Sequence, residues 1–187
     1  MVTGLPLFTL GHGTLDATAL LDLLRAAEVA AVVDIRRFPG SRRHPHVARD
    51  ALAESLPEAG IAYRWDPRLG GRRSAPSTPQ AGRDDWWQVA AFRAYAAHTR
   101  TPEFAAALDE LAGQAHGTAT AVMCSETLWW RCHRRLVADA AVLLLGLTVV
   151  HLGHDGRRTE HAPSAGARVG SGGLEYPAAA GSPVQGT

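Results

Sequence analysis

The residues best suited to chemistry lie together at positions 124–135, where the chain reads CSETLWWRCHRR. This segment supplies a carboxylate, two thiols, an imidazole, two indoles and three guanidinium groups. The apolar run before it, residues 118–123, has the length and composition of a buried strand. Thr127 can then cap a helix that continues into the apolar residues 136–145. Ligands bind at the carboxyl ends of strands in open α/β sheets, so we expect the functional site at this turn.

Polar groups also follow the first two candidate strands. The strand expected at residues 5–10 ends in the tripeptide Gly-His-Gly at 11–13, whose glycines allow a ligand to approach the backbone closely. The apolar strand expected at residues 29–35 carries Asp34 near its end. A carboxylate in that position either acts on a substrate or pairs with a neighbouring arginine, and the pattern allows both interpretations.

Arginine is concentrated in one part of the chain. All 19 residues of the Lys+Arg class are arginines, and the formal net charge of the whole chain is only +1. Residues 36–73 nevertheless hold nine arginines and four acidic residues. Phe38 stands among four of these arginines, and an aromatic ring between phosphate-binding groups can stack on a base or wedge into a duplex. This composition favours phosphate binding over a surface of solvated arginines without a ligand.

The spacing of apolar runs predicts the architecture. A chain of 187 residues with 46% apolar residues is long enough for one domain with a proper core. Five strands, expected at residues 5–10, 29–35, 61–65, 118–123 and 147–151, alternate with helices. This pattern predicts a single three-layer α/β domain with a mostly parallel, five-stranded, Rossmann-like sheet. With the strand order 3-2-1-4-5, a crevice would open between the first and fourth strands.

Composition also sets the expected domain limits and compartment. Residues 1–152 form the predicted α/β domain, and residues 153–187, rich in Gly, Ala, Ser and Pro, are expected to be a disordered tail. A second such stretch, residues 74–85, is expected to be a mobile loop or lid. The two cysteines do not resemble a disulfide framework, and neither a signal peptide nor a membrane-spanning run is evident. We therefore expect a cytoplasmic protein without membrane contact.

Five separated motifs carry a family resemblance. They are the strand ending in GHGT, followed by VVDIRRFPGSRRHP, YRWDPRLGGRR, FRAYAAHTRTPEF and MCSETLWWRCHRRLVADA. In this order they resemble the domain of unknown function 488 family over about residues 7–151, although Gly13 stands where the family pattern has Ser. The resemblance implies a single α/β domain, and links between some relatives and DNA base excision, including removal of 5-hydroxymethylcytosine, imply a nucleic-acid enzyme. The matching positions are Asp34, Arg36, Arg37, Ser41, Arg42, Cys124, Glu126, Trp130, Cys132, His133 and Arg134.

The favoured hypothesis is a monofunctional DNA glycosylase that hydrolyses the N-glycosidic bond of a modified base, with 5-hydroxymethylcytosine the leading candidate. Such an enzyme flips the base out of duplex DNA and needs carboxylates, flat side chains and phosphate-binding groups. A lysine Schiff base is excluded because the chain has no lysine. The expected catalytic residues are Asp34, Glu126, His12 and His133. The expected nucleic-acid-binding residues are Arg36, Arg37, Phe38, Ser41, Arg42, Arg43, Arg72, Arg73, Trp130, Arg134 and Arg135. The expected base pocket is Gly11, Gly13, Trp65, Cys124 and Trp129, with no metal and no cofactor.

Three alternatives remain open. Cys124, between a strand and a helix N-terminus, is placed like the nucleophile of a thiol enzyme, although no glycine-rich oxyanion cradle follows it. A metal site would use Cys124, Cys132, His133 and a fourth ligand, without the usual CxxC pairing. On a regular helix the side chains of Cys132 and His133 would diverge, which argues against a Cys–His couple. A non-catalytic module that binds nucleic acid or a nucleotide would need the arginines alone.

Overall fold

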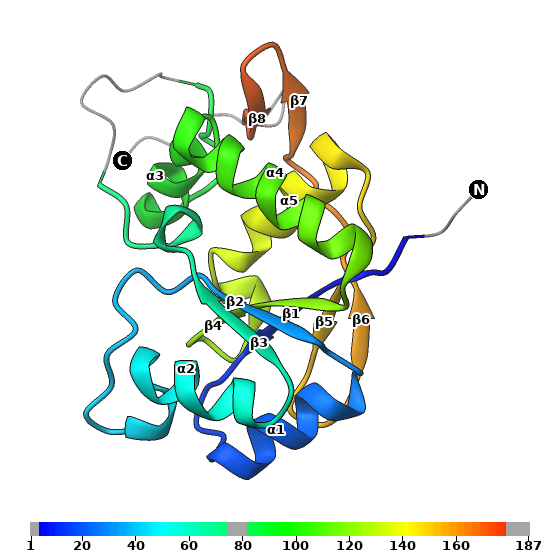
Figure 1. Cartoon of the computed structure of the whole chain (residues 1–187). Coiled ribbons are helices and arrows are strands. Elements are labelled where there is room, and N and C mark those ends of the chain that lie inside the picture. Colours follow the sequence, from blue (N-terminus) through cyan, green and yellow to red (C-terminus); the bar gives the residue numbers. More distant parts are fainter. Residues whose placement is uncertain (1–3, 75–81, 179–187) are drawn as a thin grey trace.

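The computed structural model describes residues 4–74 and 82–178. Most of the loop expected at residues 74–85 therefore lies outside the described residues. The described chain forms a six-stranded sheet, a two-stranded hairpin and five α-helices (Figure 1). The strands are β1 (Leu7–Gly11), β2 (Ala31–Asp34), β3 (Ala62–Trp65), β4 (Thr120–Cys124), β5 (Val149–Leu152), β6 (Arg158–Glu160), β7 (Arg168–Gly170) and β8 (Gly173–Glu175). The helices are α1 (Ala17–Ala26), α2 (Arg49–Glu58), α3 (Ala90–His98), α4 (Pro102–Gly117) and α5 (Arg134–Leu145).

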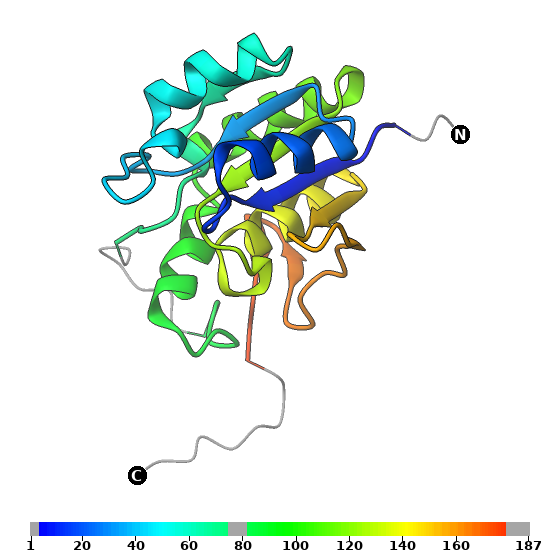
Figure 2. The same ribbon diagram turned by 90° about the horizontal axis from the view of Figure 1, so that it is seen from below.

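The expected three-layer α/β architecture is confirmed. Helices α1 and α2 cover one face of the sheet, and α3, α4 and α5 cover the other (Figures 1 and 2). Apolar side chains that alternate along the strands feed two cores, because successive residues of a strand point to opposite faces. On β4, Val122 packs with α4 and α5, whereas Met123 packs with α1 and α2. Strands β1, β2 and β4 are buried along their whole length, as expected for central parallel strands.

The expected strand order 3-2-1-4-5 is wrong. The observed order is β3-β2-β4-β1-β5-β6, in which β4 is inserted between β2 and β1. The first five strands are parallel, and β6 pairs antiparallel to β5. Right-handed crossovers are compatible with this order, since the chain moves one way through β1, β2 and β3 and returns through β4 and β5. The carboxyl ends of β2, β4 and β1 thus become direct neighbours.

The expectation of disorder is wrong for the described part of the C-terminal segment. Residues 153–178 contribute β6 and the β7–β8 hairpin, and Tyr176 is fully buried. Asp139 on α5 anchors this segment by accepting hydrogen bonds from His161 Nε2, the Ser164 backbone N–H and the Tyr176 hydroxyl. Contacts from a few anchoring residues therefore order a segment whose Gly- and Ala-rich composition predicts disorder. Residues 179–187 lie outside the described residues.

No helix within residues 4–74 or 82–178 has the length and apolarity required to cross a membrane.

Candidate active site at the carboxyl edge of the sheet

A cavity of about 780 Å³ opens where β1, β2 and β4 end. We call it the edge cavity. Its walls come from the segments that follow β1, β2, β3 and β4, and from α3 with the residue before it. Its lining residues are His12, Gly13, Arg36, Arg37, Phe38, Gly40, Ser41, His44, Gly71, Arg72, Val89, Ala91, Phe92, Tyr95, Cys124, Ser125, Glu126, Trp130, Arg131, Cys132 and His133. The volume lies within the range of small-molecule sites in proteins.

Asp34 does not line the edge cavity but holds Arg36 in its wall. Asp34 is completely buried and accepts hydrogen bonds from Arg36 Nε at 2.8 Å and from Arg36 Nη2 at 2.5 Å. Its second oxygen also accepts the Tyr63 hydroxyl at 2.8 Å. With both oxygens engaged by the protein, Asp34 acts as a positioning residue for the Arg36 guanidinium, which favours the ion-pair interpretation of this carboxylate.

His12 is neutral at physiological pH. Burial and the nearby Arg36 charge lower the pKa of His12 to about 4. Arg36 Nη1 lies 3.2 Å from His12 Nε2, and because a guanidinium only donates, this nitrogen is the acceptor. His12 Nδ1 then carries the proton, and its N–H donates a hydrogen bond to the Gly13 carbonyl at 3.1 Å. This geometry does not support His12 as a proton donor to a leaving base near neutral pH.

The segment between β4 and α5 is a loop, so the expected helix start at Thr127 is wrong. Residues Trp129–Arg131 form one 3₁₀ turn, and α5 begins only at Arg134. Arg134 is buried and donates to the backbone carbonyls of Glu126 and Thr127. A Cβ atom at Gly11 would collide with the Glu126 carbonyl, so glycine is required where this loop crosses β1.

Gly13 is also explained by this loop. Gly13 has a φ of +51°, and a Cβ atom there would collide with Thr127 Oγ1. A serine at this position would be strained.

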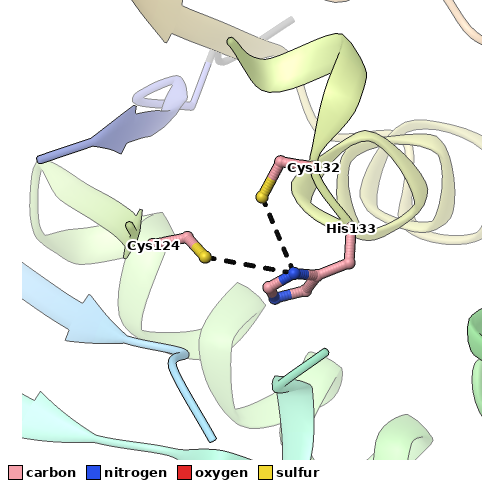
Figure 3. Close-up of side chains that lie close together, drawn as sticks. All are labelled: Cys124, Cys132 and His133. Carbon is pink, nitrogen blue, oxygen red and sulfur yellow. Dashed lines mark hydrogen bonds between the residues drawn. The ribbon is translucent and has the colours of Figure 1, made fainter. Parts of the chain in front are cut away.

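Because the loop is not helical, three side chains of types that can bind a metal converge in the wall of the edge cavity. His133 Nδ1 lies 3.6 Å from Cys132 Sγ and 4.0 Å from Cys124 Sγ. Figure 3 shows the two sulfurs pointing toward the imidazole, one from the end of β4 and the other from the loop before α5. All three ligand atoms lie within 4.8 Å of one another. The expected divergence of Cys132 and His133 is therefore wrong.

The two thiols have different proton affinities. The interaction with the neighbouring Cys132 thiol, together with burial, raises the pKa of Cys124 to about 12. The same interaction, with the charge of nearby Arg134, lowers the pKa of Cys132, although burial opposes this. His133 Nε2 is buried and has no hydrogen-bond partner among the described residues. The protonation of Cys124 weakens the hypothesis that this residue is a free thiolate nucleophile.

Positive charge and aromatic surface occur together around the edge cavity. Arg36, Arg37, Arg72 and Arg131 contribute four guanidinium groups, against the single carboxylate of Glu126. Glu126 is exposed, and its Oε1 accepts the Leu128 backbone N–H at 3.2 Å. Two large aromatic side chains of the lining are solvent-accessible: Phe38 is 65% exposed and Trp130 is 48% exposed. These groups are suited to an anionic ligand that carries a flat ring.

Several expected site residues have other contacts and do not line the edge cavity. Trp65 donates from Nε1 to the Arg36 carbonyl at 2.7 Å, and Trp129 stacks on His151 with ring centroids 4.0 Å apart. Arg73 donates to three backbone carbonyls, and Arg135 lies over the rings of Trp86 and Trp87. The remaining expected residues outside the lining are Gly11, Asp34, Arg42, Arg43 and Arg134.

The edge cavity also contains residues that the expected site leaves out. Cys132, Arg131 and Ser125 belong to the same chemistry-rich segment, and Cys132 is one of the positions that match the family pattern. Tyr95 on α3 is buried, and its hydroxyl donates to the Leu69 carbonyl at 2.6 Å. The centroids of the Tyr95 and His133 rings lie 5.0 Å apart. Tyr95 lies within the FRAYAAHTRTPEF motif, but the motif alone does not assign it to the site, since its place in the wall depends on how α3 packs over the sheet.

Comparison with known families identifies the chain. Residues 16–141 match the family described as Domain of unknown function DUF488. The match spans most of the chain, which therefore belongs to this family. No curated protein and no solved structure matches the chain.

Proposed function

We propose that this member of the domain of unknown function 488 family is a monofunctional DNA glycosylase. It would hydrolyse the N-glycosidic bond of a modified base in duplex DNA, with 5-hydroxymethylcytosine the leading candidate. The observation that carries the proposal is the composition of the edge cavity, where four arginines, two exposed aromatic rings and one accessible carboxylate meet. Each of these groups has a task in base excision.

The arginines at the rim would bind the DNA backbone. Arg37, Arg72 and Arg131 are exposed, so their guanidinium groups can contact phosphates without a large desolvation penalty. Phosphate contacts fix the register of the duplex, and they make binding strongly salt-dependent. Arg42 and Arg43, exposed in the loop next to Ser41, would extend this contact beyond the edge cavity.

The aromatic side chains would handle the flipped base. Trp130 lines the edge cavity with half of its surface exposed, and an indole in this position can stack on an extruded base. Phe38 is the most exposed of the large apolar residues described and lies in the basic loop, where it can fill the gap left in the duplex. Trp129 and Trp65 are engaged elsewhere, so the base pocket depends on Trp130.

Glu126 is the candidate catalytic carboxylate. It lines the edge cavity, and it is exposed, so it can orient a water molecule or stabilise an oxocarbenium-like sugar. Asp34 is committed to Arg36 and Tyr63, which leaves it the positioning role. The Arg36 guanidinium, fixed by Asp34, can stabilise negative charge on the departing base, a task that neutral His12 cannot perform.

The proposal is tested with a panel of short duplexes, each containing one modified base. Wild-type protein should release the free base and leave an abasic strand that mild alkali cleaves. Glu126→Gln should bind the same duplex but release base at least roughly 10²-fold more slowly, the usual contribution of a catalytic carboxylate. Glu160→Gln, an exposed carboxylate on β6, is the matched control and should behave like wild type.

Two results would refute this proposal. One is the absence of base release from every duplex by wild-type protein that is folded and binds DNA, which would favour a binding module. The other is unchanged release by Glu126→Gln, which would remove Glu126 from the reaction.

A further inference from the structure

We propose that Cys124, Cys132 and His133 form a zinc site whose fourth coordination position faces the edge cavity. The ligands would be the two Sγ atoms and His133 Nδ1. The proposal stands on the arrangement of these three side chains and does not rest on the glycosylase assignment.

The distances from the imidazole nitrogen to the two sulfurs are close to those of tetrahedral zinc. Bonds of about 2.3 Å to sulfur and about 2.0–2.1 Å to nitrogen, at tetrahedral angles, place a sulfur and a nitrogen ligand about 3.6 Å apart. The observed distances from His133 Nδ1 are 3.6 Å to Cys132 Sγ and 4.0 Å to Cys124 Sγ. Small side-chain adjustments would therefore place all three atoms around one ion.

The chemistry of the donor set points to the same metal. Two thiolates and an imidazole form a soft to borderline set that favours Zn²⁺ over Mg²⁺ or Ca²⁺. Binding converts both thiols to thiolates and releases their two protons to solvent. The two negative charges then balance the charge of the ion, which makes the assembled site neutral in an environment where Cys124 and Cys132 are both buried.

Three protein ligands leave one position of a tetrahedral ion unfilled, the arrangement typical of catalytic rather than structural zinc. All three ligands belong to the lining of the edge cavity, so water or a substrate atom can reach the fourth position. The backbone positions the ligands firmly: Cys124 ends a fully buried strand, and Gly71 packs so closely on the His133 ring that a Cβ atom there would lie 2.7 Å from Nδ1. The site is thus built on the sheet edge and not on a free loop.

The direct test is the zinc content of protein purified under reducing conditions, after dialysis against zinc and then buffer. Wild-type protein should hold one zinc ion per chain. Cys124→Ser, Cys132→Ser and His133→Ala should each weaken zinc binding by more than the roughly 10–100-fold that loss of an outer partner costs. His44→Ala, which removes another imidazole of the same lining, should bind zinc like wild type.

A second measurement uses the wild-type chain alone, in case a variant fails to fold. Zinc should protect both thiols from alkylation, and a strong chelator should restore their reactivity. Co²⁺ in place of zinc should give the intense absorption of a tetrahedral ion with thiolate ligands.

Reduced, folded wild-type protein that binds no zinc, or a variant lacking both thiols that binds it equally well, would overturn the proposal. Failure of the glycosylase assignment has a different signature: the protein would hold zinc but release no base. Release of base by protein that never binds zinc would refute the zinc site alone.

Discussion

The ends of β2 and β3 carry the same local structure, built from an aspartate and the arginine two residues later. After β2, Asp34 accepts the Arg36 backbone N–H at 3.1 Å, Nε at 2.8 Å and Nη2 at 2.5 Å. After β3, Asp66 accepts the same three groups of Arg68 at 3.2, 2.9 and 2.8 Å. We call these two structures the β2 clasp and the β3 clasp.

The surroundings of the two clasps differ because β2 lies inside the sheet and β3 lies at its edge. In the β2 clasp, Arg36 is only 6% exposed, reaches His12 and lines the edge cavity. In the β3 clasp, Arg68 is one-third exposed and pairs with Glu110 on α4. The local sequence therefore specifies the clasp, whereas the place of the strand in the sheet decides whether its arginine lines the edge cavity.

The largest expected effect follows from breaking the β2 clasp. Asp34→Asn would leave the buried Arg36 guanidinium without its compensating charge, and it should lower the free energy of unfolding by about 3–5 kcal/mol. Denaturant unfolding at neutral pH measures this loss. A change below about 1 kcal/mol, the range of ordinary substitutions, would mean that the ion pair contributes little to the fold.

Breaking the β3 clasp should have a smaller effect, because the arginines that surround Asp66 are partly exposed. Asp66→Asn should lower the free energy of unfolding by about 1–2 kcal/mol at neutral pH. Burial alone would raise the pKa of Asp66, but hydrogen bonds from Arg68 and Arg64 outweigh burial and hold this pKa below its ordinary value. This variant should leave base release unchanged, in contrast to changes in the β2 clasp.

The depressed pKa of Asp66 also predicts a pH dependence. A carboxyl group with a lower pKa in the folded state stabilises the protein fully above its unfolded pKa of about 3.9 and loses this contribution as the pH falls through the folded value. The difference in unfolding free energy between wild type and Asp66→Asn should therefore be greatest at neutral pH and shrink below about pH 4. A difference that stays constant into the acid range would contradict the assigned role of the carboxylate.

The smallest effect should come from the outer partner of the β3 clasp. Glu110 is on the surface, and Arg68 keeps its bonds to Asp66 when Glu110 is lost. Glu110→Gln should leave both the unfolding midpoint and base release unchanged, because exposed ion pairs contribute little. Destabilisation equal to that of Asp66→Asn would show that the outer pair, and not the clasp, holds this part of the fold.

Much of the framework could be predicted from local patterns. Apolar runs bounded by glycine, proline and polar residues predict the five parallel strands, and the rule that ligands bind at their carboxyl ends predicts the place of the cavity. His12, Arg36, Cys124 and Glu126 directly follow or end these strands, so they could be assigned to the lining from the sequence.

The remaining features depend on long-range packing. Strand order is not encoded in periodicity, since β1, β2 and β4 are all apolar enough to occupy the centre of the sheet. In the loop before α5, buried Arg134 donates to the Glu126 carbonyl, and this carbonyl packs against Gly11. Glu126 and Gly11 are far apart in the chain, so this packing is not visible in the local sequence. Asp139 similarly orders the C-terminal segment through partners that composition does not reveal.

The central claim is that the arginine of the β2 clasp acts in the proposed base release and the arginine of the β3 clasp does not. One matched pair of variants tests it most directly. Arg36→Lys and Arg68→Lys both keep the positive charge and lose the planar fork that the aspartate holds. Single-turnover base release should fall by roughly 10²-fold in Arg36→Lys, since misplacement of a positioned group has effects of this size, and stay within about twofold of wild type in Arg68→Lys. Equal rates for the two folded variants would contradict the claim.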